Sequence, residues 1–204
     1  MGVVSFASGV LLAGGASRRF GAVKLLHPFR GEPMVLAVVR AFLASGLDEV
    51  LLVVGAHGAV ADAVAGTGVR TVVNPGWESG MFSSVLAGLA SLDPRSQLAL
   101  LSPADLPLLT AGAVGRVLAG ARGDGDRSVT LPVSDGRRGH PVALPAPIVR
   151  EVLSWPVTAR LDQVLDGRFP VRCLPGFGPE VFRDVDVPAQ LPADAAKARR
   201  PLIS

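Results

Sequence analysis

The sequence predicts an α/β protein that folds as a single Rossmann-like domain, with a mostly parallel sheet and helices on both faces. Short runs of Val, Leu and Ala alternate with longer segments in which apolar residues recur every three or four positions. The length of 204 residues and the hydrophobic content of 49% suit one domain with a sizeable core. No internal repeat or linker divides the chain. We therefore expect a domain over residues 1–190, followed by a tail at 191–204 whose Ala-, Pro- and Arg-rich composition favours disorder.

The first half of the chain shows the clearest alternation of strands and helices. Strands are expected at 9–12, 49–54, 69–73 and 97–101, and helices at 33–45, 79–92 and 111–121. Pro33 near the start and Gly46 just past the end delimit the first helix. Thr110 is the expected N-cap of the third helix.

In the second half of the chain, strand-like and helix-like segments alternate less regularly. Strands are expected at 127–132, 141–144, 169–174 and 181–185, and helical segments at 147–153 and 160–165. The single cysteine, Cys173, excludes an internal disulfide framework and a Cys-rich zinc site. Since Cys173 stands among apolar residues, we expect it to be buried.

Charge and composition exclude several classes of protein. The net charge is only +3, aromatic residues make up 5% of the chain and Tyr is absent, so a nucleic-acid-binding surface is not expected. Paired arginines such as Arg18-Arg19 and Arg137-Arg138 suit small anionic phosphates better. No stretch approaches the ~20 apolar residues of a membrane span, and residues 1–12 lack the basic start of a signal peptide. The expected location is the cytoplasm, without a membrane partner.

The most informative segment, Leu11 to Lys24, directly follows the first expected strand. It therefore lies at the carboxyl edge of the sheet, where open α/β sheets bind ligands. Gly14 and Gly15 let the backbone approach a nucleotide closely, and Arg19 and Lys24 supply positive charge for a triphosphate. A Walker A loop is excluded, since Lys24 has no Gly before it and no Ser or Thr after it. The dinucleotide-binding fingerprint is excluded because position 16 is Ala.

This loop resembles the Leu-Ala-(Ala/Gly)-Gly-x-Ser-x-Arg-x-Gly-x-x-Lys loop of the MobA-like nucleotidyltransferases. That family includes the molybdenum cofactor cytidylyl- and guanylyltransferases. The resemblance implies a fold of the GT-A type and catalytic roles for Arg19 and Lys24. It implies nucleotide binding by Leu12, Ala13, Gly14, Gly15, Ser17, Arg19 and Lys24.

Two further segments match the family in the same order. Residues 74–84 are similar to the Asn-x-x-Trp-x-x-Gly-x-x-x-Ser segment of the cytidylyltransferase branch, which implies nucleotide binding by Asn74, Gly80 and Ser84. In the alternative reading, Ser79 only caps the helix. The segment 100–107 resembles the family's strand that ends in an aspartate, so Asp105 would be catalytic and hold Mg²⁺.

The last matches concern the acceptor and the second metal ligand. Residues 136–142 resemble the family's Gly-x-x-Gly-His/Asn-Pro segment, so Arg137, Arg138, Gly139 and His140 would bind the acceptor. A basic hairpin tip without a ligand remains the alternative. Residues 183–188 resemble the Asp-(Ile/Val)-Asp-Thr-Pro element, which makes Asp186 the second metal ligand. Asp184, two residues earlier on the same face of a strand, is the reserve candidate.

The resemblance implies transfer of an NMP unit, with CMP favoured, from an NTP to a phosphorylated acceptor such as molybdopterin. It also implies transient contact with a molybdoenzyme or its chaperone. Three departures leave the substrate open: Val23 replaces an acidic residue, Gly14 is commoner in the guanylyl branch, and 156–178 lacks the Gly-Asp-x-Gly-x-Arg pattern. The alternatives are a molybdenum cofactor guanylyltransferase, a sugar-1-phosphate nucleotidyltransferase, and a non-enzymatic protein that binds and delivers nucleotide or cofactor.

Overall fold

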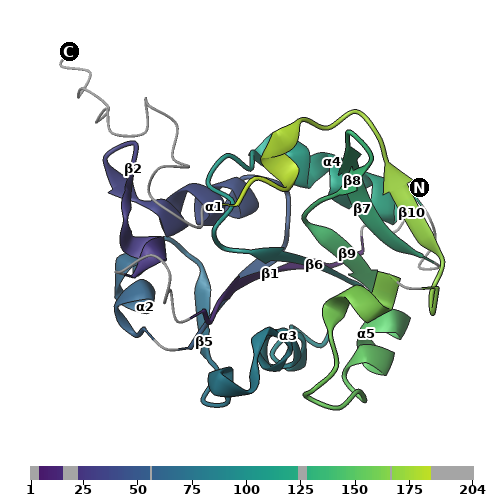
Figure 1. Ribbon diagram of the computed structural model, residues 1–204, viewed down its shortest axis with the longest axis horizontal. Helices are drawn as coiled ribbons and strands as arrows, with labels where there is room; N and C mark the ends of the chain where they lie inside the picture. The colour runs from purple at the N-terminus through teal and green to yellow at the C-terminus, as the bar shows by residue number, and fades with distance from the viewer. Residues whose placement is uncertain (1–4, 16–22, 56, 124–127, 166, 185–204) are drawn as a thin grey trace.

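A computed structural model describes residues 5–15, 23–55, 57–123, 128–165 and 167–184. Within these residues, eight strands form one sheet in the order β10-β7-β9-β6-β1-β4-β5, with β8 paired to β7 (Figure 1). The strands are β1 (Ala7–Ala13), β4 (Glu49–Val54), β5 (Arg70–Val73), β6 (Leu98–Pro103), β7 (Val129–Ser134), β8 (Arg137–Arg138), β9 (Val142–Pro145) and β10 (Val171–Leu174). A separate two-stranded ribbon joins β2 (Pro28–Phe29) to β3 (Glu32–Pro33).

The half of the sheet formed by β5, β4, β1 and β6 is entirely parallel. Beyond β6 the direction changes, because β9 runs antiparallel to both β6 and β7, and β10 is parallel to β7. The prediction of a mostly parallel sheet is confirmed. Strands β1 and β4 are buried along nearly their whole length, as expected of apolar strands covered on both faces.

Helices cover both faces of the sheet, as predicted (Figure 1). One face packs against α1 (Met34–Leu43), α2 (Ala59–Ala63) and α4 (Ala111–Arg122). The other face packs against α3 (Met81–Ala90) and α5 (Ala146–Val152). Both apolar layers contain side chains from β1, which therefore lies at the centre of the core.

The predicted helix boundaries hold where the sequence carries a capping signal. The Thr110 side chain accepts a hydrogen bond from the Ala113 backbone N–H at 3.1 Å and so caps α4. Pro33 is the N-cap residue of α1, and Gly46 takes a φ of 85° just beyond the end of that helix.

Short elements held by local turns escaped prediction. The ribbon β2–β3 turns through Arg30 and Gly31, whose φ angles are 52° and 84°. Helix α2 has only five residues and buries a single side chain, Val60. Such short segments carry too few positions for a periodic pattern.

Two expectations were wrong. In the described part of 181–185 there is a 3-10 turn, η4 (Pro179–Val181), instead of a strand. The Phe182 and Arg183 N–H groups both donate to the Pro179 carbonyl, at 3.2 and 2.9 Å, so the chain folds back before it can extend. Cys173 is exposed rather than buried, because β10 is the edge strand of the sheet. No helix in the described part of the chain is long and apolar enough to cross a membrane.

Candidate active site

The candidate site lies where the parallel strands end at their carboxyl edge. Gly14 and Gly15 follow β1, Gly55 follows β4, Asn74 follows β5 and Asp105 comes two residues after β6. The Ala104 backbone N–H donates to the Leu12 carbonyl at 3.0 Å, which ties the end of β6 to that of β1. The fold therefore brings Gly14, Gly15 and Asp105 to one edge of the sheet, as the sequence predicts.

Lys24 and Asp105 form an ion pair at this edge. The Nζ of Lys24 lies 2.6 Å from Oδ2 of Asp105, and the two side chains are only 15% and 20% exposed. Lys24 opens the 3-10 turn η1 (Lys24–Leu26), which is anchored by the buried Leu25. The other carboxylate oxygen, Oδ1, is buried and has no hydrogen-bond partner in the described part of the protein. A charged oxygen in that position is suited to a cation ligand.

Asn74 and Ser84 support the glycine loop from behind. The Asn74 Nδ2 group donates to the hydroxyls of Ser83 and Ser84, at 2.8 and 3.0 Å, and its Oδ1 accepts from the Gly76 N–H at 3.0 Å. All three side chains of this network are buried. A Cβ built on Gly14 would lie 2.5 Å from the Ser84 Oγ. The network thus holds α3 against the backbone of Gly14, which explains why a glycine stands there.

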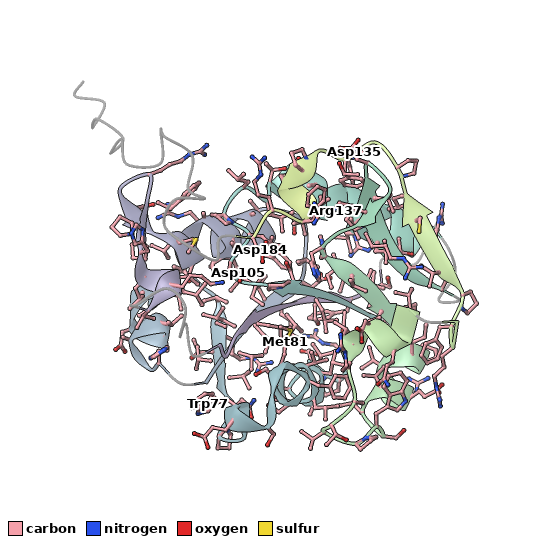
Figure 2. All side chains as sticks on the ribbon, in the orientation of Figure 1. Trp77, Met81, Asp105, Asp135, Arg137 and Asp184 are labelled. Carbon is pink, nitrogen blue, oxygen red and sulfur yellow. The ribbon has the colours of Figure 1, made fainter. Side chains whose placement is uncertain are left out.

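The amino end of α3 faces the same edge. Its N-cap residue is Gly80, with a φ of 106°, and no side chain caps the first turn. Met81 lies one turn before Ser84 and on the same side of the helix. Its side chain, which is labelled in Figure 2, is 69% exposed. An uncapped helix start with an apolar side chain beside it is suited to an anionic ligand that also carries a ring.

His140 stands two residues before β9. Burial lowers the pKa of His140 below its usual range, while a backbone hydrogen bond with Leu101 and the negative charge of Asp105 oppose that shift. Its Nδ1 atom is buried and has no partner among the described residues. The imidazole is therefore neutral near pH 7 and close enough to Asp105 to sense its charge.

Arg137 and Arg138 form the second strand of a tight hairpin with β7. The turn residues Asp135 and Gly136 both have positive φ angles, 49° and 73°, as a two-residue hairpin turn requires. The Arg137 guanidinium carbon lies 4.0 Å above the centre of the Phe182 ring. The two arginines therefore lie on a short hairpin, and Arg137 is engaged by an aromatic side chain.

Comparison with models of known protein families shows which family the chain belongs to. Residues 9–171 match the model of the MobA-like NTP transferase domain, which includes the strand, glycine loop and Asp105 described above. The chain belongs to the MobA-like NTP transferase family. It is thus a member of a nucleotidyltransferase-type family, as the sequence analysis predicted from its motifs.

Several MobA-like and related proteins are similar over most of the chain. Nicotine blue oxidoreductase of Paenarthrobacter nicotinovorans is 37% identical over 163 residues, which cover 76% of this chain and 79% of that protein. The molybdenum cofactor cytidylyltransferase of Escherichia coli K12 is 25% identical over 158 residues, with the same shares of 76% and 79%. The crystal structure of Rv0371c from Mycobacterium tuberculosis H37Rv superposes with a TM-score of 0.80 and 27% identity, covering 92% of this chain and 96% of that one.

Some predicted site residues of this family member lie outside the described residues. They are Ser17, Arg19 and Asp186. The described residues predicted to bind nucleotide or metal all lie at or beside the carboxyl edge of the sheet. They are Leu12, Ala13, Gly14, Gly15, Lys24, Asn74, Gly80, Ser84 and Asp105. The described residues hold no cluster of three or more His, Cys, Asp or Glu side chains that could hold a metal ion.

Sequence reasoning missed two residues of this edge. A Cβ on Gly55 would lie 2.7 Å from Trp77 Cβ and 2.9 Å from the Gly14 carbonyl, so three segments meet at that glycine. Its signal was a glycine directly after a buried strand. Met81 was missed because a methionine at a helix start reads as an ordinary core residue.

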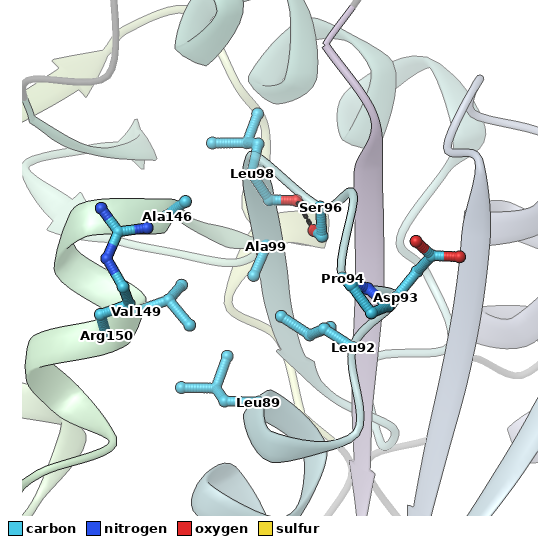
Figure 3. A pocket seen from close by; sticks show the side chains of 10 residues that line it. All are labelled: Leu89, Leu92, Asp93, Pro94, Ser96, Leu98, Ala99, Ala146, Val149 and Arg150. Atoms are coloured by element: carbon cyan, nitrogen blue, oxygen red, sulfur yellow. Dashed lines mark hydrogen bonds between the residues drawn. The ribbon is translucent and has the colours of Figure 1, made fainter.

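A separate pocket of about 250 Å³ lies at the opposite edge of the sheet (Figure 3). It is lined by Leu98 and Ala99 at the amino end of β6, by the loop after α3, and by Arg150 of α5. Asp105 stands at the other end of β6, so this pocket is not part of the candidate active site.

Proposed function

We propose that this protein transfers an NMP unit, with CMP favoured, from an NTP to a phosphorylated acceptor of the molybdopterin type and releases pyrophosphate. The observation that carries the proposal is the Lys24–Asp105 pair at the carboxyl edge, beside a glycine loop and the uncapped start of α3. This arrangement supplies charge of both signs where a triphosphate and its cation would lie. The choice of CMP and of the acceptor is supported by the likeness to the molybdenum cofactor cytidylyltransferase.

The residues at this edge fit Mg²⁺. Asp105 offers a buried carboxylate oxygen that no other group engages among the described residues, and a hard oxygen ligand is what Mg²⁺ prefers. When bound, Mg²⁺ would neutralise charge on the phosphates. The second carboxylate would come from Asp186 or Asp184.

In the proposed reaction an acceptor phosphate oxygen attacks the α-phosphorus in line and forms a new P–O bond. The bond from the α-phosphorus to the bridging oxygen of the β-phosphate breaks, and pyrophosphate leaves with that electron pair. Lys24, and Arg19 by prediction, stabilise the charge that develops on the leaving group. The acceptor phosphate is ionised near pH 7, so the step needs no protein base. The residues that we propose line the acceptor side are Arg137, Arg138, Gly139 and His140.

A second candidate deserves a test because a specific observation favours it. Nicotine blue oxidoreductase is 37% identical to this chain, a higher identity than that of the cytidylyltransferase. An oxidoreductase of this kind would transfer electrons from a donor to nicotine blue, instead of transferring a nucleotidyl group. Such a transfer makes no use of a carboxylate poised for a cation, so the Lys24–Asp105 pair favours nucleotidyl transfer.

The deciding experiment measures pyrophosphate release with molybdopterin and Mg²⁺, comparing CTP, GTP, ATP and UTP, with Asp105→Asn as the matched control. We expect release with CTP and its loss in the variant. Release with GTP instead identifies a guanylyltransferase, and release with a hexose 1-phosphate identifies a sugar-nucleotide enzyme. Oxidation of reduced nicotinamide nucleotide with nicotine blue, unchanged in Asp105→Asn, would replace the proposal by the second candidate. Nucleotide binding without any turnover would instead indicate a non-enzymatic protein that binds and delivers nucleotide or cofactor.

A further inference from the structure

The carboxylate of Asp105 is in direct contact with one cation of the protein itself, the ammonium of Lys24. The distance of 2.6 Å between Lys24 Nζ and Asp105 Oδ2 is that of a charge-assisted hydrogen bond. Only 15% and 20% of the two side chains are exposed, so water and salt screen their charges weakly. A second cation at this carboxylate would therefore experience the positive charge of Lys24 strongly.

A divalent cation bound by Asp105 would lie close to that ammonium. Oδ1, which has no hydrogen-bond partner among the described residues, is bonded to the same carbon atom as Oδ2. Mg²⁺ binds an oxygen ligand at about 2.0–2.1 Å, so an ion at Oδ1 and the ammonium at Oδ2 would be separated by little more than the carboxylate group. Two positive charges that close repel each other, and the repulsion weakens binding of the divalent cation.

Lys24 is built to exchange Asp105 for another anion. The η1 turn holds its backbone, since the His27 N–H donates to the Lys24 carbonyl at 3.1 Å. The ammonium, by contrast, is a compact charge at the end of a long flexible stem. The triphosphate that we propose at the glycine loop would offer anionic oxygens to the same ammonium. A bound nucleotide can therefore take Lys24 from Asp105 and so remove the repulsion.

We propose that Lys24 makes metal binding depend on the nucleotide: it weakens binding of a divalent cation to Asp105 until a triphosphate takes over the ammonium. The cation and the nucleotide then bind together, in preference to the cation alone. This inference rests on the proposed function for the triphosphate. It gives Lys24 a part in the order of binding, in addition to stabilisation of the leaving group.

The first test measures Mn²⁺ binding to the full chain by electron paramagnetic resonance, without nucleotide. We expect Lys24→Met and Lys24→Gln to bind Mn²⁺ roughly tenfold more tightly than the wild type, because the repelling charge is gone. Lys24→Arg keeps that charge and should bind Mn²⁺ as weakly as the wild type. Adding Asp105→Asn to Lys24→Met should abolish the gain, which assigns the bound ion to Asp105. A gain in affinity cannot arise from a general loss of structure.

The matched control is Arg122→Met. Arg122 also pairs with an aspartate, Asp48, at 3.6 Å, and it donates to the Ser5 carbonyl just before β1, at the opposite edge of the sheet. The substitution removes one positive charge, as Lys24→Met does, but leaves the surroundings of Asp105 unchanged. Mn²⁺ binding should therefore stay at the wild-type value. An equal gain in both variants would show that net charge alone sets the affinity, and would overturn the inference.

The second test uses a CTP analogue that has a methylene group between its α- and β-phosphorus and so cannot be cleaved there. Its dissociation constant is measured by calorimetry with and without Mn²⁺. We expect Mn²⁺ to tighten analogue binding by a larger factor in the wild type than in Lys24→Met, because only the wild type has a repulsion for the triphosphate to relieve. Binding of Mn²⁺ to the free analogue is the same for both proteins and cancels in this comparison.

The sign of the first result decides the matter. Weaker Mn²⁺ binding in Lys24→Met would overturn the inference, since Lys24 would then be an outer-shell partner that orients Asp105 for the ion. Unchanged binding, or equal factors in the second test, would overturn it as well. Failure of the proposed function has a different signature: the analogue would bind to neither protein, whereas the Mn²⁺ affinity of the free protein would still rise in Lys24→Met.

Discussion

Lys24 Nζ lies 2.6 Å from Asp105 Oδ2, and the remaining oxygen of that carboxylate is buried without a hydrogen-bond partner among the described residues. One half of the carboxylate is thus neutralised by the protein, and the other half is left for a ligand. Burial of an unpaired charged oxygen is costly, so the arrangement indicates a functional site more than a stabilising one.

Replacing Lys24 alone should therefore destabilise the fold. In Lys24→Met the Asp105 carboxylate loses its cation at a site that is only 20% exposed, and we expect a loss of about 1–2 kcal/mol in the free energy of unfolding. The double variant Lys24→Met/Asp105→Asn should regain most of that loss, because no charge is then left unpaired. Urea denaturation of the wild type, of Lys24→Met, of Asp105→Asn and of the double variant measures both effects. Pyrophosphate release should fall by about 100-fold or more in every variant, since each lacks a group that stabilises the transferring phosphates.

A different result would contradict this reading of the pair. If Lys24→Met kept the stability of the wild type and Asp105→Asn lost it, Asp105 would be held by other groups and Lys24 would be dispensable to the fold.

The close approach of Gly14 to Ser84 gives a second prediction. In Gly14→Ala the new Cβ would lie 2.5 Å from the Ser84 Oγ, so the loop or α3 must shift, at a cost of about 1–3 kcal/mol. The KM for the nucleotide should rise as the loop moves. Adding Ser84→Ala removes the obstructing oxygen and should recover part of both losses. Gly15→Ala is the control, because a Cβ there meets nothing within 4 Å. Equal losses in Gly14→Ala and Gly15→Ala would show that the glycines serve chain flexibility instead.

The lowered pKa of the buried His140 leads us to expect that the stability of the folded protein depends on pH. Burial lowers the pKa of its imidazole in the folded protein, below the value of 6.5 that describes an unhindered histidine. Between the lowered pKa and 6.5 the unfolded chain binds more protons than the folded one, so stability falls as the pH drops through this window. Thermal unfolding of metal-free protein between about pH 7.5 and 5 should show this fall. In His140→Asn, which keeps a polar group near the Nδ1 position, the slope should be smaller; an unchanged slope would assign it to other groups.

The sequence predicted the parts of the site that lie on regular elements. Asp105 follows a six-residue apolar strand, and Gly14 follows another, so the parallel pairing of β6 with β1 places them together. The positions of Lys24 and Ser84 could be expected from the same topology. Their partners could not, because the Lys24–Asp105 and Ser84–Gly14 contacts depend on how a 3-10 turn and a helix start pack in three dimensions.

The acceptor side was harder to predict for a physical reason. Arg137 and Phe182 are 45 positions apart, and no local pattern in the sequence pairs them. The strand expected at 181–185 would have carried Phe182 and Asp184 on one face. The turn at Pro179 changes that direction, and a turn of three residues leaves no periodic signal. The contact between the two loops is a property of the folded chain alone.

Met81 carries the last prediction. Its side chain is 69% exposed at the start of α3, one turn before Ser84, whose Oγ faces the backbone of Gly14. A thioether in that position is suited to packing on the face of a nucleobase, a contact worth about 0.3–1.5 kcal/mol. Met81→Ala should raise the KM for the nucleotide about fivefold with kcat unchanged, because packing of this kind binds the ground state and the transition state equally. Met81→Leu should keep most of the affinity. Leu153→Ala, at an apolar residue that is 38% exposed beyond α5, is the control and should alter neither constant. A fall in kcat at constant KM would instead place Met81 against the reacting phosphates.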